Sequence, residues 1–291
     1  MFGPLGERLY HYTSGTKAID LILPSMRLML NPFAAMRDPR ESSLWLLTAF
    51  WDGALRGSAS HDPDPTAVMR EVIEAGSAAK LKFKIASLTH DDVTHVLEDE
   101  LTDSLAYGYG HPRLWEPYAD NYAGACLCFN RFRLLEAFKD QFAVRGFYSL
   151  GPIIYRQDRG VDRELLFVRM TRVREFGVVG AVDRHLQKHC EEFFFHKLRD
   201  WETEAEFRLL YFADHDQPEF MDISGCIETV LCGYLMPEDE IDRVIAICEP
   251  HGIAVHRLRW LNALPMWMPA KPTGGGAFID AIVPNDLPDY V

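Results

Sequence analysis

The sequence lacks the long apolar run that a membrane-spanning helix needs. Its apolar stretches, such as Leu165–Val168 and Phe193–Phe195, are far shorter than the roughly 20 residues required to cross a bilayer. Residues 1–8 also lack the basic and then apolar pattern of a secretory signal. We therefore expect a cytoplasmic protein with no membrane partner.

Cysteine is present, but not at a spacing that binds metal. The chain has six cysteines and no convincing CxxC pair, so the sequence predicts no metal site. Their neighbours are mostly apolar, which is typical of buried, reduced thiols. The six are Cys126, Cys128, Cys190, Cys226, Cys232 and Cys248. We expect all of them to be free.

Basic residues are fewer than acidic residues in this sequence. The 30 Lys and Arg residues are outnumbered by 43 Asp and Glu residues, which gives a formal net charge of −13. A broad, sequence-independent grip on nucleic acid needs many cations to neutralise phosphates, so it is not expected here. Two local basic stretches remain, at 131–145 and 156–174. Each is either a solvated face or a phosphate-binding surface.

The sequence also lacks an internal repeat and a glycine-rich phosphate-binding fingerprint. The glycine run at 274–276 neither follows a predicted strand nor precedes a helix. Alternating apolar residues predict strands at 82–88, 122–129, 151–155, 204–212, 229–234 and 253–258. Helical spacing predicts helices in the first part of 16–30 and at 131–142, 182–198 and 237–248.

Helices and strands mixed without regular β-α-β order favour an α+β fold. We expect a single domain over residues 1–265 with a central, mostly antiparallel sheet. The Asp-Pro repeats within 58–65 predict a mobile insertion, and the glycines and prolines of 266–291 predict a loosely held tail.

Three short polar motifs stand out against this apolar background. They are Leu9–Ser14, Trp115–Asn121 and Trp201–Arg208. Each places a histidine, a tyrosine or a carboxylate beside bulky residues that expect burial. Polar groups in apolar surroundings are costly unless paired, and sites of chemistry are where that cost recurs. The motifs therefore predict one composite site assembled from distant segments.

The motifs, in this order, resemble a bacterial family, the domain-of-unknown-function family 2971. Its members have an opening LYxYTS, a loop with asparagine or aspartate before proline, a W-x-x-Y-A-D segment that runs on into G-x-C-L-x-F, and a late K-x-x-x-W-x-x-E-x-E-x-R. Here these correspond to Leu9–Ser14, Asp38-Pro39, Trp115–Phe129 and Lys197–Arg208, so that the resemblance spans about residues 9–260. The usual asparagine of the proline loop is displaced here to Asn31.

This family in turn is similar to ADP-ribosyltransferases, in the opening His-Tyr-Thr and in the late Glu-x-Glu. The resemblance implies an ADP-ribosyltransferase-like fold and NAD as substrate. It also implies a macromolecular acceptor, either nucleic acid or protein, and a role as a toxin or antiphage defence effector. Cleavage of the nicotinamide–ribose bond passes through an oxocarbenium-like centre, which a carboxylate stabilises.

The resemblance also implies roles for individual residues. Glu206 would stabilise the oxocarbenium-like centre, with Glu204 assisting or contacting the acceptor, and His11 would bind the nicotinamide ribose. The residues expected to bind substrate are Tyr12, Thr13, Tyr118, Asp120 and Arg208. Among them, a tyrosine would stack on the nicotinamide ring and Arg208 would pair with a carboxylate or the pyrophosphate.

Structural explanations of the same residues remain open. His11 is also consistent with a paired core histidine, and Tyr118 with a packing aromatic. The glutamates also fit a surface ion network with Arg208 and Lys197. Trp115 and Trp201 are expected in the core. At the level of function, the alternatives are a non-catalytic module that binds a nucleotide or a partner and, less favoured because no metal-ligand spacing stands out, a metal-dependent nuclease.

Overall fold

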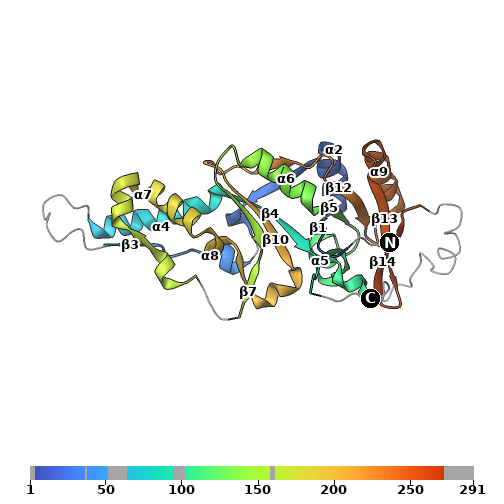
Figure 1. Cartoon of the computed structure of the whole chain (residues 1–291), viewed down its shortest axis with the longest axis horizontal. Coiled ribbons are helices and arrows are strands. Elements are labelled where there is room, and N and C mark those ends of the chain that lie inside the picture. The colour runs from blue at the N-terminus through green and yellow to red at the C-terminus, as the bar shows by residue number, and fades with distance from the viewer. Residues whose placement is uncertain (1–3, 37, 52–63, 95–101, 158–160, 272–291) are drawn as a thin grey trace. The chain divides into compact units, whose positions relative to one another are not determined.

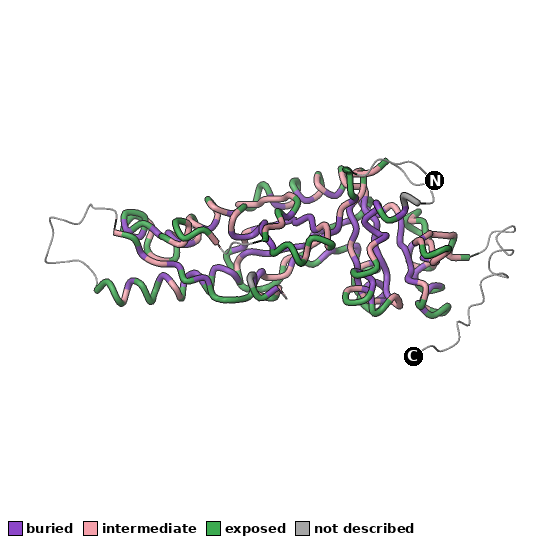
Figure 2. The backbone as a smooth tube through the Cα atoms, turned by 90° about the horizontal axis from the view of Figure 1, so that it is seen from below, coloured by how far each residue is buried: buried purple, intermediate pink, exposed green. Residues whose placement is uncertain are grey.

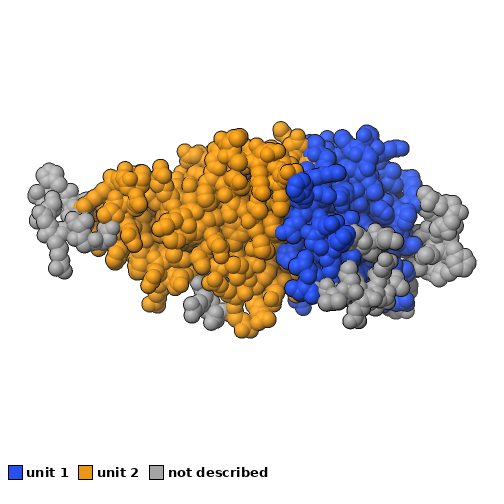
Figure 3. Space-filling view, viewed as in Figure 1, with its two compact units in different colours: residues 1–26, 90–133, 224–291 blue, residues 27–89, 134–223 orange. Residues whose placement is uncertain are grey.

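Helices and strands are mixed along the part of the chain that the computed structural model describes, residues 4–36, 38–51, 64–94, 102–157 and 161–271 (Figure 1). This confirms the predicted α+β class. By their contacts, the segments group into two compact units, each of which is described by itself (Figure 3). Unit 1 comprises residues 1–26, 90–133 and 224–291, and unit 2 comprises residues 27–89 and 134–223.

Unit 1 contains a mostly antiparallel sheet of order β1-β5-β12-β13-β14. Its strands are β1 (Arg8–Thr13), β5 (Ala125–Asn130), β12 (Ile227–Cys232), β13 (Ala254–Leu261) and β14 (Leu264–Pro269). Strands β12 and β13 are parallel, and a parallel pair needs a crossover connection. Helix α9 (Glu238–Cys248) supplies it, with three acidic residues in its first turn as the helix dipole favours.

The remaining helices of unit 1 are short. A continuous helical segment follows β1, in the pieces α1 (Gly15–Lys17), the π-helix η1 (Ala18–Ile22) and α2 (Leu23–Ser25). Ser14 caps this segment, because its side chain accepts a hydrogen bond from the Lys17 N–H. The other pieces are η3 (Thr102–Ala106), η4 (Gly108–Gly110), α5 (Pro112–Tyr118) and η7 (Glu249–His251).

Unit 2 has an antiparallel sheet of order β11-β2-β4-β10-β6. Its strands are β11 (Glu219–Asp222), β2 (Arg27–Pro32), β4 (Phe83–His90), β10 (Glu206–Phe212) and β6 (Tyr148–Pro152). Two short parallel pairs add β3 (Thr48–Phe50) with β8 (Phe167–Arg169), and β7 (Ile154–Arg156) with β9 (His196–Leu198). Figure 2 shows buried residues gathered along the strands.

Unit 2 has a large aromatic core that includes Phe33, Trp45, Phe83 and Phe194, and helices α4, α7 and α8 contribute apolar residues to it. Among the described residues, five helices lie wholly or mostly in this unit. They are α3 (Pro39–Ser42), α4 (Pro65–Lys82), α6 (Arg131–Phe142), α7 (Met170–Lys188) and α8 (Cys190–Phe194). The 3₁₀ turns are η2 (Phe33–Ala35), η5 (Arg163–Leu166) and η6 (Arg199–Glu204). Helix α7 is kinked at Gly177, whose φ of 71° lies in the left-handed region.

Several predicted boundaries differ from the structure. The helix expected over 182–198 is the end of α7, then α8, then strand β9, and the strand expected from Glu204 begins at Glu206. Of the tail predicted over 266–291, residues 266–269 pair with β13, whereas 272–291 lie outside the described residues. Of the insertion predicted at 58–65, residues 58–63 also lie outside them, and Asp64 caps helix α4.

No helix in the described residues is both long enough and apolar enough to cross a membrane.

Candidate functional site

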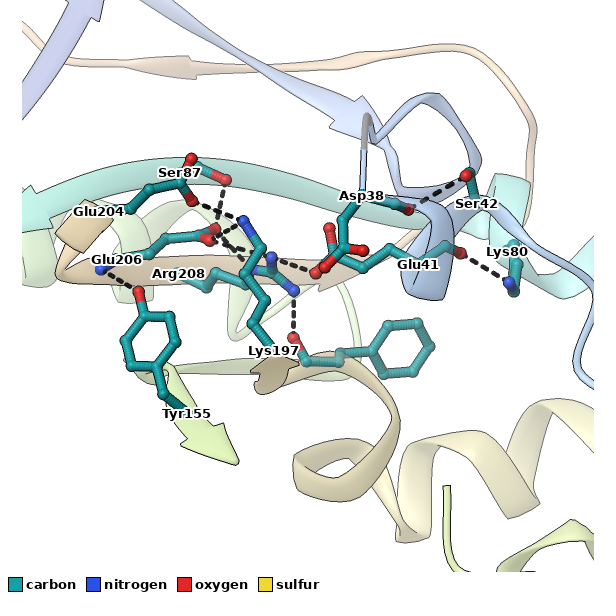
Figure 4. Close-up of polar contacts among 11 residues, drawn as sticks. Asp38, Glu41, Ser42, Lys80, Ser87, Tyr155, Lys197, Glu204, Glu206 and Arg208 are labelled. Atoms are coloured by element: carbon teal, nitrogen blue, oxygen red, sulfur yellow. Dashed lines mark hydrogen bonds and ion pairs between the residues drawn. The ribbon is translucent and has the colours of Figure 1, made fainter. Parts of the chain in front are cut away.

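Glu204, Glu206 and Arg208 of the third motif meet Lys197 in unit 2, although the four residues lie on three different elements (Figure 4). Lys197 is on β9, Glu204 ends the 3₁₀ turn η6, and Glu206 and Arg208 are on β10. With Glu41 from α3 they form a cluster of three carboxylates and two cations, which we call the ion array. The Lys197 ammonium joins the two motif glutamates, at 2.8 Å from Glu204 Oε2 and 2.7 Å from Glu206 Oε2.

Glu206 is the most enclosed carboxylate of the motif, with 3% of its side chain exposed. Arg208 Nε donates to its Oε1 at 2.6 Å, and the Ser87 hydroxyl donates to the same oxygen at 2.6 Å. Burial alone would raise the pKa of Glu206, but Arg208 and Lys197 outweigh burial and lower that pKa to about 2. Glu206 is therefore a fixed negative charge near neutral pH.

The surrounding strands explain why these side chains share one face. In the register of β10 with β4, Arg208 lies opposite Ser87, and Glu206 lies two residues away along β10. Residues i and i+2 of a strand point to the same side of a sheet. Ser87 and Glu206 are then diagonal neighbours, close enough for a hydrogen bond. The backbone N–H of Glu206 donates to the Tyr155 hydroxyl at 2.8 Å, which ties the start of β10 to β7.

Arg208 is fully buried and uses its guanidinium in three directions. Beyond Glu206, Nη2 pairs with the Glu41 carboxylate and Nη1 donates to the Phe194 carbonyl. Burial raises the pKa of Glu41, and Arg208 offsets only part of that effect. Burial would lower the pKa of Lys197, but Glu206 and Glu41 outweigh it and raise that pKa. The array is thus held together by mutual pairing of groups that would each be costly alone.

Glu204 and Trp201 form the outer edge of the ion array. The Glu204 side chain is 12% exposed, against 3% for Glu206, so solvent reaches Glu204 more readily than Glu206. Trp201, expected in the core, is only partly buried, and the Lys197 ammonium lies 5.5 Å from its ring centroid. The Glu204 carboxylate, the Lys197 ammonium and the Trp201 indole therefore lie together beside the buried Glu206–Arg208 pair.

The first and middle motifs meet in unit 1. Strands β1 and β5 pair, and the Tyr12 ring packs edge-on against Trp115 with centroids 5.2 Å apart. The Gly15 N–H, just after the first motif, donates to the Asp120 carboxylate at 3.2 Å. Tyr12 is buried, its hydroxyl donates to the Gly108 carbonyl, and Thr13 is buried as well. His11 and Tyr118 are partly exposed.

Three consecutive residues at the end of the middle motif and just after it adopt left-handed backbone conformations. Asp120, Asn121 and Tyr122 have φ values of 47°, 50° and 67°. Such conformations cost free energy for residues other than glycine, so the surroundings must hold them in place. The segment after β12 holds the turn at Tyr122, because the Gly233 backbone passes close to the Tyr122 carbonyl and the Leu235 N–H donates to that carbonyl.

The structure therefore groups the predicted residues by unit. His11, Tyr12, Thr13, Tyr118 and Asp120 lie in unit 1, whereas Glu204, Glu206 and Arg208 lie in unit 2. The single composite site stays a prediction. Glu41 and Ser87 were not predicted as site residues, since nothing in their local sequence marks them. In the described residues, no group of three or more histidine, cysteine or acidic side chains is placed to hold a metal ion.

Comparison with known families supports the family resemblance in part of the chain. Residues 114–209, about a third of the 291 residues, match the model of a family described as a protein of unknown function (DUF2971). The match contains the middle motif and the third motif. The comparisons with curated proteins and with solved structures gave no match to this chain.

Proposed function

We propose that this chain is an NAD-consuming ADP-ribosyltransferase with an ADP-ribosyltransferase-like fold, acting on a macromolecular acceptor. The observation that carries this proposal is that both glutamates of the Glu-x-Glu motif pair with the same lysine. Lys197 lies within 2.8 Å of Glu204 and 2.7 Å of Glu206, one carboxylate at the edge and one enclosed. Paired carboxylates in different surroundings are the arrangement that chemistry at a glycosidic carbon uses.

In the reaction, the bond between the ribose C1′ and the nicotinamide nitrogen breaks, and its electron pair leaves with nicotinamide. A nucleophilic atom of the acceptor bonds to C1′ and gives up its proton; if water takes that place, the product is ADP-ribose. Positive charge develops on the ribose as the bond breaks. Glu204, at the edge, is the carboxylate placed to stabilise that charge, and Glu206 is the fixed charge that orients Lys197 beside it.

Other residues take secondary roles in this proposal. The partly exposed Trp201 ring offers an apolar surface to the substrate beside Glu204. In unit 1, His11 and Tyr118 are partly exposed and Asp120 is exposed, so these three motif residues are able to meet a ligand there. Tyr12 and Thr13 are buried, so they support the local structure.

The alternative function is a non-catalytic module that binds a nucleotide or a partner protein. The burial of Glu206 favours it, because a carboxylate that is 3% exposed and already accepts from Arg208 and Ser87 serves the structure well without meeting a substrate. The two functions differ in whether NAD is consumed.

Nicotinamide release from NAD is the decisive measurement. We expect release by the native protein and a loss of about 10²-fold or more in Glu204→Gln, the size typical of removing one charge-stabilising group. Glu202→Gln is the matched control, because Glu202 lies on the same 3₁₀ turn and pairs with Arg199 at the surface. Full activity in Glu204→Gln would refute its role. No release by the native protein with any acceptor fraction, together with nucleotide binding by calorimetry, would establish the alternative.

A further inference from the structure

Lys80, on helix α4, binds the backbone of the segment that carries Glu41. Its buried ammonium donates to the Glu41 carbonyl at 2.6 Å and to the Ser43 carbonyl, and it lies 3.8 Å from the centroid of the Trp45 ring. Two hydrogen bonds and one cation–π contact engage the three N–H groups of an ammonium. A single side chain thus holds the last part of the α3 turn, at Glu41 and Ser43.

The segment that Lys80 holds is short and supplies one member of the ion array. Helix α3 has only four residues, and so little helix has no stability of its own. It presents the Glu41 carboxylate to Arg208, and Arg208 in turn binds Glu206 through Nε and Nη2. The contacts therefore run in series from Lys80 through Glu41 and Arg208 to Glu206 and Lys197 (Figure 4).

We propose that Lys80 is a positioning residue, which holds Glu41 on Arg208 and thereby sets the geometry of Glu206, Lys197 and Glu204. The part of this inference that concerns catalysis rests on the proposed function. The part that concerns the hydrogen bonds of Arg208 is independent of that function. Lys80 touches no substrate in this role and acts through Glu41.

The charge on Lys80 can be lost at mildly alkaline pH. Burial lowers the pKa of Lys80 to about 8, and Glu41 offsets only part of that effect. The groups that face the ammonium are Glu41 and Ser43 from the α3 segment, Trp45 from the irregular stretch between α3 and β3, and the Phe33 ring of η2, whose centroid lies 5.8 Å away. Loss of the charge removes the cation–π contact and weakens the two hydrogen bonds. The array should therefore loosen as the pH rises through about 8.

The first test follows Arg208 directly. Solvent exchange of its Nε–H, measured by NMR, should be slow in the native protein and at least about tenfold faster in Lys80→Met, because the bond to Glu206 opens more often. Lys82→Met is the matched control. Lys82 lies on the same helix and pairs with Asp183 and Asp214, away from Glu41. Unchanged exchange in Lys80→Met would overturn the proposal, whatever the outcome for NAD.

The second test is the pH profile of nicotinamide release. The native protein and Lys82→Met should lose activity as the pH rises through about 8, whereas Lys80→Met should be slower by roughly 10²-fold and lack this alkaline fall.

If Lys80→Met does not fold, Lys80→Arg replaces it in both tests. An arginine keeps its charge at all these pH values, so Arg208 should stay protected and the alkaline fall should disappear. An alkaline fall that persists in Lys80→Arg would refute the role of Lys80. Absence of release by the native protein would refute the proposed function but leave the exchange test intact.

Discussion

Glu206 shows how strongly one residue depends on its partners. A buried ion pair contributes little to net stability, but removing one member leaves an uncompensated charge in a low-dielectric interior. Glu206 faces both Arg208 and Lys197, so its loss would leave two cations short of a partner. The cost of a change at this position should therefore appear in folding stability before it appears in any assay of function.

Glu206→Gln should lower the free energy of unfolding by about 3 to 5 kcal/mol at neutral pH, the usual cost of breaking a buried pair. The pKa of Glu206 is lowered in the folded protein, so its contribution is present above about pH 4.5 and is lost as the pH falls to about 2. Urea unfolding at several pH values should show the difference from the native protein shrinking across that window. Glu202→Gln, at the surface, should change stability by no more than about 0.5 kcal/mol. Equal stability of Glu206→Gln and the native protein at neutral pH would contradict the pairing.

At the scale of elements, the sequence pattern predicts amphipathic helices well and misses those built on small residues. The helix over Arg131–Phe142 is confirmed, and the helix predicted over 237–248 is observed as Glu238–Cys248. Helix α4 was not predicted, since its buried face includes Ala75, Gly76 and Ala79, which give a weak apolar signal.

The same limit applies to the candidate site. Lys197, Glu204, Glu206 and Arg208 are close in sequence, and their motif marks them. Glu41 lies 167 residues from Arg208, and its contact depends on how the sheet brings α3 to β10. No local pattern encodes such a long-range contact, so only a structure reveals it.

A close backbone crossing in unit 1 gives a test at this scale. A Cβ atom at Gly233 would lie 1.9 Å from the Tyr122 carbonyl oxygen, so Gly233→Ala forces the left-handed turn apart. We expect a loss of about 2 kcal/mol or more, as for overpacking in a core, seen as a lower thermal midpoint. Gly151→Ala is the control, because a Cβ there meets Phe195 at an ordinary 3.9 Å. A Gly233→Ala protein as stable as Gly151→Ala would show that the crossing is looser than described.

At the scale of the whole molecule, all six cysteines are buried free thiols. This confirms the sequence-based expectation, which rested on apolar neighbours and the lack of a pairing pattern. Burial raises the pKa of several of these thiols, including Cys190 to about 12 and Cys248 to about 11. Because the thiolate is the reactive form, buried thiols with raised pKa values are inert.

Alkylation followed by intact-mass measurement tests this description. Native protein should add alkyl groups very slowly at neutral pH, whereas protein unfolded without reductant should add six, one for each cysteine. Four or fewer additions in the unfolded, unreduced protein would reveal a disulfide. Rapid addition to the native protein would show that a cysteine described as buried is accessible.

Ala205, the residue between Glu204 and Glu206, must adopt a left-handed backbone conformation, and the motif Glu-x-Glu does not state this requirement. Ala205 has a φ of 42°, which turns the chain from the 3₁₀ helix that ends at Glu204 into the strand that starts at Glu206. Glycine, asparagine and aspartate tolerate this conformation, and β-branched residues resist it. The residue type at the middle position of Glu-x-Glu is therefore restricted. Proteins with the same left-handed residue between the two glutamates should not have valine, isoleucine or threonine there. Two glutamates with valine between them would match the charges of this site while being unable to make its bend.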